Sequence, residues 1–119
     1  MPLKTRCVYE KPTDDEGHRV LVMRYWPRGV RRDAVDVWER DLGTQPDLIR
    51  AWKGGEVTWQ EFAKRYRASV APQKAKIAEL AERTKKETVT LLCSCRDESR
   101  CHRIVLKELI AAAARQRRR

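Results

Sequence analysis

The residues best suited to chemistry lie between positions 93 and 103, in the run Cys-Ser-Cys-Arg-Asp-Glu-Ser-Arg-Cys-His-Arg. The run contains Cys93, Cys95 and Cys101, and His102 follows directly on the last of these cysteines. A helix N-terminus and nearby arginines lower a thiol pKa from about 8.5 into a range of roughly 3.5–7.5, which makes the thiolate available as a nucleophile. We therefore predict a reactive thiolate at Cys101, with His102 and Cys93 as the other catalytic candidates.

The same side chains have two alternative uses. A Cys3His set for zinc, a metal that thiolates favour, would consist of Cys93, Cys95, Cys101 and His102. The usual zinc knuckle has about two to four residues between its cysteines, and neighbours on a helix diverge by about 100°. Both points count against zinc, so we predict no cofactor and keep zinc as an alternative. Free cysteines are also commonly buried as small apolar residues, and Cys101 would then do no chemistry.

A strand must end, and a helix begin, for this run to form a site. Apolar residues predict strands over 3–9, 19–25 and 88–93, the last leading into the cysteine run. Apolar stripes at helical spacing predict helices through 37–42, 48–52, 59–70, 77–81 and 105–113. Thr58 and Glu61 form a capping box before the third of these helices. This order predicts a small three-layer, Rossmann-like α/β domain with a mostly parallel sheet flanked by helices.

The direction of the strands decides which other residues reach the cysteines. In an open parallel sheet, ligands bind beyond the carboxyl ends of the strands. If 19–25 runs parallel to 88–93, the residues after both meet at one edge, and His18 lies roughly 20 Å away at the other. The ligand-binding candidates at the shared edge are Arg24, Trp26, Arg28, Gly29, Cys95 and Arg103. An aromatic wall, guanidinium groups and a thiol floor suit a small anionic or phosphorylated ligand.

Composition sets bounds on the partners. The 119 residues allow one domain, which we place at 1–114, with a basic tail at 115–119. Lysine and arginine total 27 against 17 acidic residues, and a net charge of +10 favours anionic partners. A nucleic-acid-binding module that uses the basic surface and the arginine tail is therefore the rival function. No apolar run approaches a membrane span or a secretion signal, so we expect a cytoplasmic protein with no membrane partner; the oligomeric state stays open.

Several motifs, spread over nearly the whole chain, follow one another in the order seen in a known family. They are Arg19-Val20-Leu21-Val22, Trp26-Pro27-Arg28-Gly29, Trp38 with Asp41-Leu42, Trp59-x-x-Phe62-x-x-x-Tyr66 and Val89-Thr90-Leu91-Leu92. In these motifs the sequence resembles domain-of-unknown-function family 488, in its short YeaO-like branch. The resemblance implies a small α/β fold and no established reaction.

The cysteine run also has counterparts in that family. Longer members of the wider family carry a Cys-x-Glu element at this strand end and a Cys-His-Arg triplet at the next helix. Cys93 matches the first cysteine, and Cys101-His102-Arg103 matches the triplet. Cys95 stands where the acidic residue would be, so the resemblance implies that any acid–base role there is lost or moves to Asp97 or Glu98.

Overall fold

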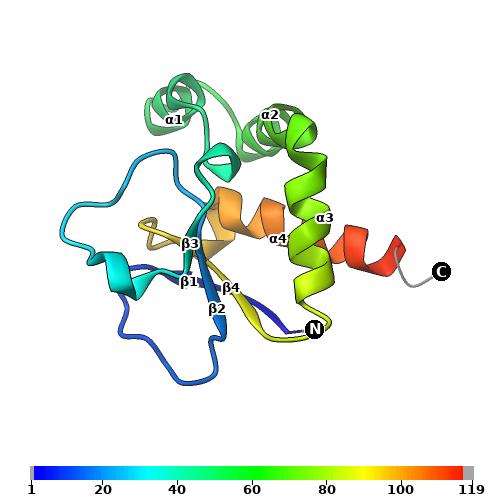
Figure 1. The fold of residues 1–119 in the computed structure, drawn as a ribbon. Coiled ribbons are helices and arrows are strands. Elements are labelled where there is room, and N and C mark those ends of the chain that lie inside the picture. The colour runs from blue at the N-terminus through cyan, green and yellow to red at the C-terminus, as the bar shows by residue number, and fades with distance from the viewer. Residues whose placement is uncertain (1, 117–119) are drawn as a thin grey trace.

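The structure, a computed structural model, describes residues 2–116, which form strands, α-helices and short 3-10 helices (Figure 1). The strands are β1 (Leu3–Cys7), β2 (His18–Leu21), β3 (Val37–Trp38) and β4 (Val89–Cys93). The α-helices are α1 (Pro46–Lys53), α2 (Trp59–Val70), α3 (Lys74–Arg83) and α4 (His102–Gln116). The 3-10 helices are η1 (Arg32–Ala34), η2 (Arg40–Leu42), η3 (Ala71–Gln73) and η4 (Glu98–Arg100).

All strand pairs in the sheet are parallel, as the sequence predicted, and their order is β1-β4-β2-β3. Strand β4 lies between β1 and β2, and each of its residues is buried. A strand covered on both faces needs a continuous apolar run, which Val89-Thr90-Leu91-Leu92-Cys93 supplies apart from Thr90. The hydroxyl of Thr90 donates a hydrogen bond of 2.7 Å to the Glu16 carbonyl, which satisfies the buried oxygen.

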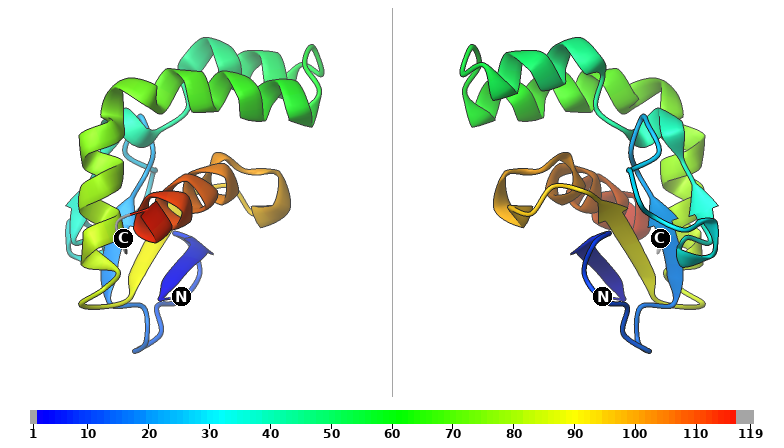
Figure 2. Two further views of the ribbon diagram at one scale, coloured as in Figure 1. Left: turned by 90° about the vertical axis from the view of Figure 1, so that its right-hand side faces the viewer. Right: turned by 90° about the vertical axis from the view of Figure 1, so that its left-hand side faces the viewer.

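Helices cover one face of the sheet and irregular chain covers the other, which makes the three layers of this small α/β domain (Figures 1 and 2). The larger apolar cluster joins the sheet to α2, α3 and α4, with Tyr66, Leu80 and Leu106 among its buried members. A smaller cluster on the other face packs Leu21 and Leu92 against residues of the segment 22–36 and Trp38. The sheet is therefore buried from both sides, although only one layer is helical.

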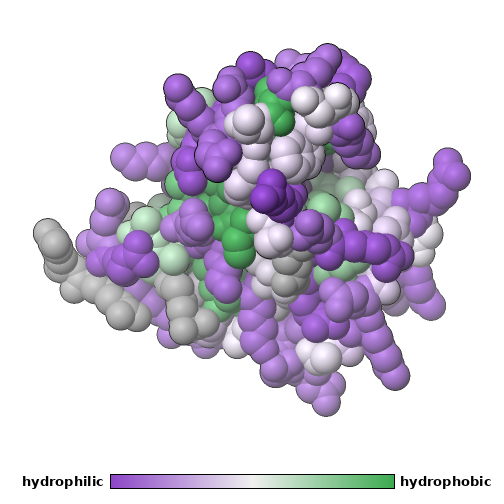
Figure 3. Space-filling model, turned by 180° about the vertical axis from the view of Figure 1, so that it is seen from behind, coloured by the Kyte–Doolittle hydropathy of each residue, from purple (hydrophilic) through white to green (hydrophobic). Residues whose placement is uncertain are grey.

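Helices α1 and α2 form an arm, residues 46–70, that overhangs the carboxyl ends of the strands (Figure 2). Thr58 caps α2, and its hydroxyl accepts a hydrogen bond of 3.1 Å from the Glu61 amide, as the capping box predicts. Seen from behind, the surface is mostly polar, and apolar side chains gather in the hollow below the arm (Figure 3).

The predicted helix through 37–42 is wrong. Val37 and Trp38 form strand β3, which pairs with Val20 and Leu21, and the 3-10 helices η1 and η2 flank it. The Trp38 indole N–H donates a hydrogen bond of 2.7 Å to the Met23 carbonyl, which holds this edge of the sheet to the chain that leaves β2. Pairing with a distant strand outweighed a local apolar spacing that two turns of helix would also satisfy.

The connection between β1 and β2 is short, and buried polar contacts hold it. The Glu16 side chain is 1% exposed and forms ion pairs with Arg6, at 3.0 Å, and with Arg19. Gly17 follows with a φ of 63°, and a Cβ added there would lie 2.2 Å from the Thr88 carbonyl oxygen. Only glycine fits this backbone conformation and this approach together.

At the other end of the chain, α4 includes Arg115 of the predicted basic tail, whereas residues 117–119 lie outside the described residues. Within residues 2–116, no helix has both the length and the apolar composition that crossing a membrane requires.

Candidate functional site

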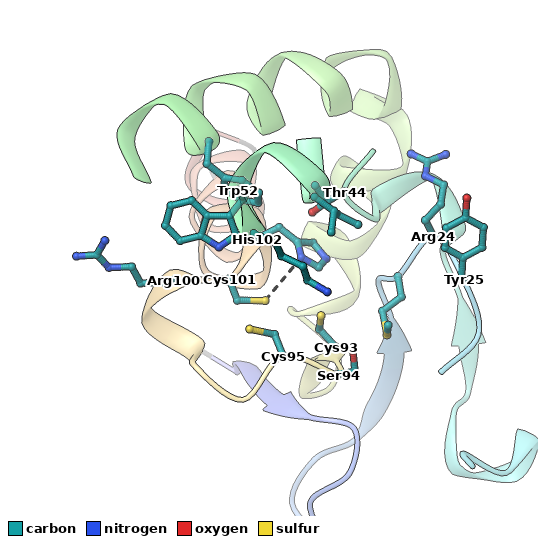
Figure 4. A pocket seen from close by; sticks show the side chains of 14 residues that line it. Arg24, Tyr25, Thr44, Trp52, Cys93, Ser94, Cys95, Arg100, Cys101 and His102 are labelled. Carbon is teal, nitrogen blue, oxygen red and sulfur yellow. Dashed lines mark hydrogen bonds between the residues drawn. The ribbon is translucent and has the colours of Figure 1, made fainter. Parts of the chain in front are cut away.

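A pocket of about 370 Å3 lies between the arm and the carboxyl ends of β2 and β4 (Figure 4). Three parts of the chain line it: the residues after β2, the arm with the chain before it, and the β4–α4 junction. The lining residues are Met23, Arg24, Tyr25, Thr44, Ile49, Trp52, Lys53, Phe62, Cys93, Ser94, Cys95, Arg100, Cys101 and His102. The two parallel strand ends thus meet at one site, as the sequence predicted.

The predicted catalytic residues come together on the floor of this pocket. Cys93 is the last residue of β4, Cys101 directly precedes α4, and His102 is the first residue of α4. A sulfur from each cysteine and a ring nitrogen of His102 all lie within 4.8 Å of one another, and the three residues are buried. Each also lines the pocket, so a small ligand can reach the cluster.

Cys101 and His102 are adjacent, yet the Cys101 sulfur lies 3.6 Å from Nδ1 of His102. The expected divergence of about 100° applies only when both residues are helical. Cys101 has φ −129° and ψ 148°, which is extended backbone, so its side chain does not follow the helical rotation. The geometric objection to a shared role for these two residues is therefore wrong.

The hydrogen bonds of His102 decide which of its nitrogens carries the proton. Nε2 lies 2.5 Å from the Val22 carbonyl oxygen, which can only accept a hydrogen bond. The proton therefore resides on Nε2, and the lone pair of Nδ1 faces the Cys101 sulfur. The imidazole ring also packs against Tyr66, with 5.4 Å between the ring centroids, so its orientation is fixed from two sides.

The pKa values of the two floor cysteines, Cys93 and Cys101, shift in opposite directions. The hydrogen bond from Cys101 lowers the pKa of Cys93 below its ordinary value, against the effect of burial. The same contact, together with burial, raises the pKa of Cys101 to about 11. Burial also raises the pKa of Cys95. The lowered pKa that the sequence predicted for Cys101 is thus found at Cys93 instead.

Arg103 supports the cluster from inside the protein. It is 0% exposed, its Nε donates to the Cys101 sulfur at 3.3 Å, and its terminal nitrogen donates to the Cys95 carbonyl at 2.7 Å. It does not line the pocket, although the sequence placed it among the ligand-binding residues. In this position Arg103 holds the 95–101 turn against the start of α4.

The remaining ligand-binding candidates divide into two groups. Arg24 and Cys95 line the pocket, whereas Trp26, Arg28 and Gly29 do not. The Trp26 indole N–H donates to the Val30 carbonyl at 2.8 Å, and its ring packs edge-on against Trp38 in the cluster on the other face of the sheet. His18 begins β2 opposite Val89, at the far end of the strands from Cys93, as expected.

Sequence reasoning missed the part of the site that the arm contributes. Trp52 and Phe62 belong to the apolar stripes that predicted helices through 48–52 and 59–70; their ring centroids lie 5.5 Å apart, and both residues also line the pocket. Lys53 was not singled out, and Arg100 was considered only as one of the arginines near Cys101, yet both line the pocket. Nothing in the local sequence of α1 or α2 signals that the arm lies over the strand ends, because that placement depends on tertiary packing.

Comparisons with known proteins agree on the relatives of this chain. Residues 3–114 match a family described as the Active DUF488-N3 subclade. The chain is 31% identical over 110 residues to the uncharacterized protein YeaO of Escherichia coli, covering 91% of this chain and 96% of that protein. It is 35% identical over 105 residues to the uncharacterized protein Rv3073c of Mycobacterium tuberculosis, covering 87% and 88%. No solved structure matches the chain.

Proposed function

The chain belongs to the DUF488 family, in the subclade described as Active DUF488-N3. We propose that its pocket binds a small anionic ligand and that the thiols on the pocket floor act on that ligand. The match covers every residue that lines the pocket. The observation that carries the proposal is the placement of a buried Cys–His contact beneath a pocket whose charged lining groups are all basic.

The charge of the lining supports an anionic ligand. Arg24, Lys53 and Arg100 are the charged groups among the described lining residues, and no carboxylate is among them. Arg24 and Arg100 lie on opposite sides of the pocket in Figure 4. Arg24 is partly engaged, because it forms an ion pair with Asp41 at 3.9 Å and donates to the Gly43 carbonyl at 3.3 Å. A lining whose described residues carry basic groups and no carboxylate favours a phosphate or carboxylate ligand.

The aromatic wall supports a ligand with an apolar part. Trp52 and Phe62 face the pocket from the arm, and Ile49 adds an aliphatic surface beside them. In pockets of this kind, apolar and aromatic side chains contact the apolar part of the ligand, and a few polar groups orient the ligand. The proposed ligand therefore carries an acidic group at one end and a planar or aliphatic group at the other.

The chemistry we assign to the floor is nucleophilic attack by sulfur. Because the pKa of Cys101 is raised, its thiol needs a general base, and Nδ1 of His102, 3.6 Å away, takes the proton as the sulfur forms a bond to an electrophilic atom of the ligand. The leaving group departs with the bonding electron pair. Cys93 supports this step as the neighbouring thiol, and the Val22 carbonyl holds His102 in the tautomer that can accept the proton.

Alkylation with two matched reagents tests both halves of the proposal. Iodoacetate and iodoacetamide react with thiols in the same way, but only iodoacetate is anionic. We expect the ratio of the two alkylation rates at the floor cysteines, followed by peptide mass spectrometry, to exceed the ratio for a small free thiol. Lys53→Gln should lower that ratio by about threefold to fivefold, because it removes one nearby charge.

Arg50→Gln is the matched control, because Arg50 lies on the same helix and carries the same charge but does not line the pocket. It should leave the ratio within experimental error of the unmodified protein. Equal rate ratios in the protein and the free thiol would contradict the proposal, as would an equal effect of both substitutions.

The rival function, binding of nucleic acid, rests on the net charge of +10 and the arginine tail. Its signature is binding that weakens steeply with salt, because counterions are released from the phosphate backbone. Such binding, lost on deletion of residues 115–119 and unchanged by Cys101→Ser, would favour the rival over the pocket.

A further inference from the structure

The floor of the pocket holds donor atoms in an arrangement that suits a metal ion. The sulfurs of Cys93 and Cys101 and a ring nitrogen of His102 lie within 4.8 Å of one another. In Figure 4 the side chains of these residues converge between the arm and the 94–101 turn. Two sulfurs and an imidazole nitrogen are soft to intermediate donors, which favour zinc and similar ions over magnesium or calcium.

The spacing of the donor atoms agrees with tetrahedral coordination. Zinc binds cysteine sulfur at about 2.3 Å and histidine nitrogen at about 2.0–2.1 Å, so tetrahedral angles place the two donors about 3.6 Å apart. The Cys101 sulfur and Nδ1 of His102 are 3.6 Å apart. The same calculation gives about 3.8 Å for two sulfurs, within the 4.8 Å limit that the cluster satisfies.

The surroundings hold the donors in a form that can bind a metal. Ligating histidines almost always donate their second ring N–H to a carbonyl or carboxylate, which fixes the tautomer. Nε2 of His102 has this partner in the Val22 carbonyl, at 2.5 Å, and Nδ1 is left with a lone pair toward the sulfurs. Nε of Arg103 donates to the Cys101 sulfur at 3.3 Å, a contact that also stabilises a thiolate.

The geometry points to a binding site for a zinc-class divalent cation, ligated by the sulfurs of Cys93 and Cys101 and by Nδ1 of His102, with its fourth position open to the pocket. Binding releases the two thiol protons to solvent and leaves two thiolates and one neutral imidazole on the ion. Cys95 is not a ligand: it lies outside the group of mutually close donors, and its sulfur contacts the Asp97 carbonyl at 3.6 Å.

This inference rests on the proposed anionic pocket and shares its residues; with the ion bound, Cys101 is a metal ligand, so its role as nucleophile belongs to the metal-free protein. With the ion bound, the floor presents an electrophilic centre to an anionic ligand, and three protein ligands with one open position are typical of catalytic zinc sites. The ion also occupies the sulfurs, so it should slow alkylation of Cys93 and Cys101.

Cobalt(II) is the probe for the test, because it takes tetrahedral zinc sites and is coloured. Titration of the reduced full-length protein should produce a sulfur-to-cobalt charge-transfer band that saturates at one ion per chain, and zinc should abolish it. Cys93→Ser, Cys101→Ser and His102→Gln should each weaken cobalt binding by about 100-fold or more, because each removes a ligand.

Two cysteine variants serve as matched controls. Cys7→Ser changes another buried cysteine, whose sulfur contacts the Ser94 carbonyl at 3.6 Å outside the cluster. Cys95→Ser changes the pocket cysteine that the assignment leaves out. Both should keep cobalt binding within about threefold of the unmodified protein; an equal loss in Cys95→Ser would overturn the three-ligand set. Circular dichroism shows whether each variant folds.

X-ray absorption of the zinc-loaded unmodified protein gives a readout that needs no variant, and it should find two sulfur and one nitrogen donor from the protein. Absence of the cobalt band overturns the metal site. If iodoacetate preference persists in that case, the proposed function stands without it. A cobalt band in a protein without iodoacetate preference would leave the metal site and overturn the anionic pocket.

Discussion

Arg103 is the residue on which the floor of the pocket most depends for its position. Its guanidinium reaches the Cys101 sulfur and the Cys95 carbonyl from a fully buried position, so it fixes both ends of the turn between β4 and α4. The fork of a guanidinium can serve two acceptors at once, and an ammonium group on a straight chain cannot reproduce that geometry.

Arg103→Lys should therefore lower the free energy of unfolding by about 1.5–3 kcal/mol, the range for loss of a hydrogen bond to a charged group. Urea denaturation measures the change. Arg100→Lys, at an exposed position on the same turn, should change the free energy by less than about 0.5 kcal/mol. Equal effects of the two substitutions would show that the buried contacts of Arg103 do not hold the turn.

Tyr66 offers a second test at this scale, because its hydroxyl is buried and donates to the Leu42 carbonyl at 2.7 Å. Burial raises the pKa of Tyr66, so the hydroxyl stays protonated and remains a donor. Tyr66→Phe leaves that carbonyl without its partner and should destabilise the protein by about 1–3 kcal/mol in thermal or urea unfolding.

Tyr9→Phe is the matched comparison for Tyr66. The Tyr9 hydroxyl donates to the Arg28 carbonyl at 2.9 Å, but the residue is 46% exposed, so water replaces the lost bond. Its effect should be smaller than about 0.5 kcal/mol. If Tyr9→Phe destabilised the protein as much as Tyr66→Phe, burial would not be what makes the Tyr66 hydrogen bond important.

Among the elements, the turn into β2 has the most restrictive backbone. Gly17→Ala should lower the free energy of unfolding by at least about 3 kcal/mol, because a left-handed conformation costs a non-glycine residue about 1–2 kcal/mol and the new Cβ meets the Thr88 carbonyl. Gly55→Ala has a similar φ, 72°, with nothing within 4 Å of the added carbon, so it should show only the conformational part. Differential scanning calorimetry of both variants separates the two contributions.

Most elements could be predicted from the sequence because their signals are local. The N-cap at Thr58 and the apolar run at 88–93 each depend on a few neighbouring residues, and the structure confirms the cap on α2 and the strand β4. Strand β3 could not be predicted in this way, since two residues become a strand only by pairing with β2. The position of the arm over the strand ends could not be predicted for the same reason. The pocket wall that Trp52 and Phe62 form was therefore missed as well.

The site shows a similar division. Parallel strands bring the residues after β2 and β4 to one edge, and the sequence allows that deduction. It does not say which of those residues turn toward the helical face: Arg24 does line the pocket, while Trp26 packs on the opposite face against Trp38. The side chains switch faces between positions 24 and 26, in irregular chain. Irregular chain has no periodic pattern of apolar residues from which that switch could be predicted.

At the scale of the whole molecule, β4 should be the most stable part of the fold, because it pairs on both sides and is buried throughout. Native-state hydrogen exchange should find the amides of Val89–Cys93 among the slowest, opening only with global unfolding. The amides of Val37 and Trp38, in a two-residue edge strand, should exchange at least about 100-fold faster. Equal protection of the two strands would contradict this ranking.

The irregular layer over the second face of the sheet has a practical consequence. The segment 22–36 crosses that face around Gly29, which is exposed and has open space where a Cβ would be, while the arm and α4 enclose the pocket on the helical side. A peptide inserted beside Gly29 should therefore project into solvent without replacing a residue that lines the pocket. This position suits the attachment of a fluorescent or affinity label.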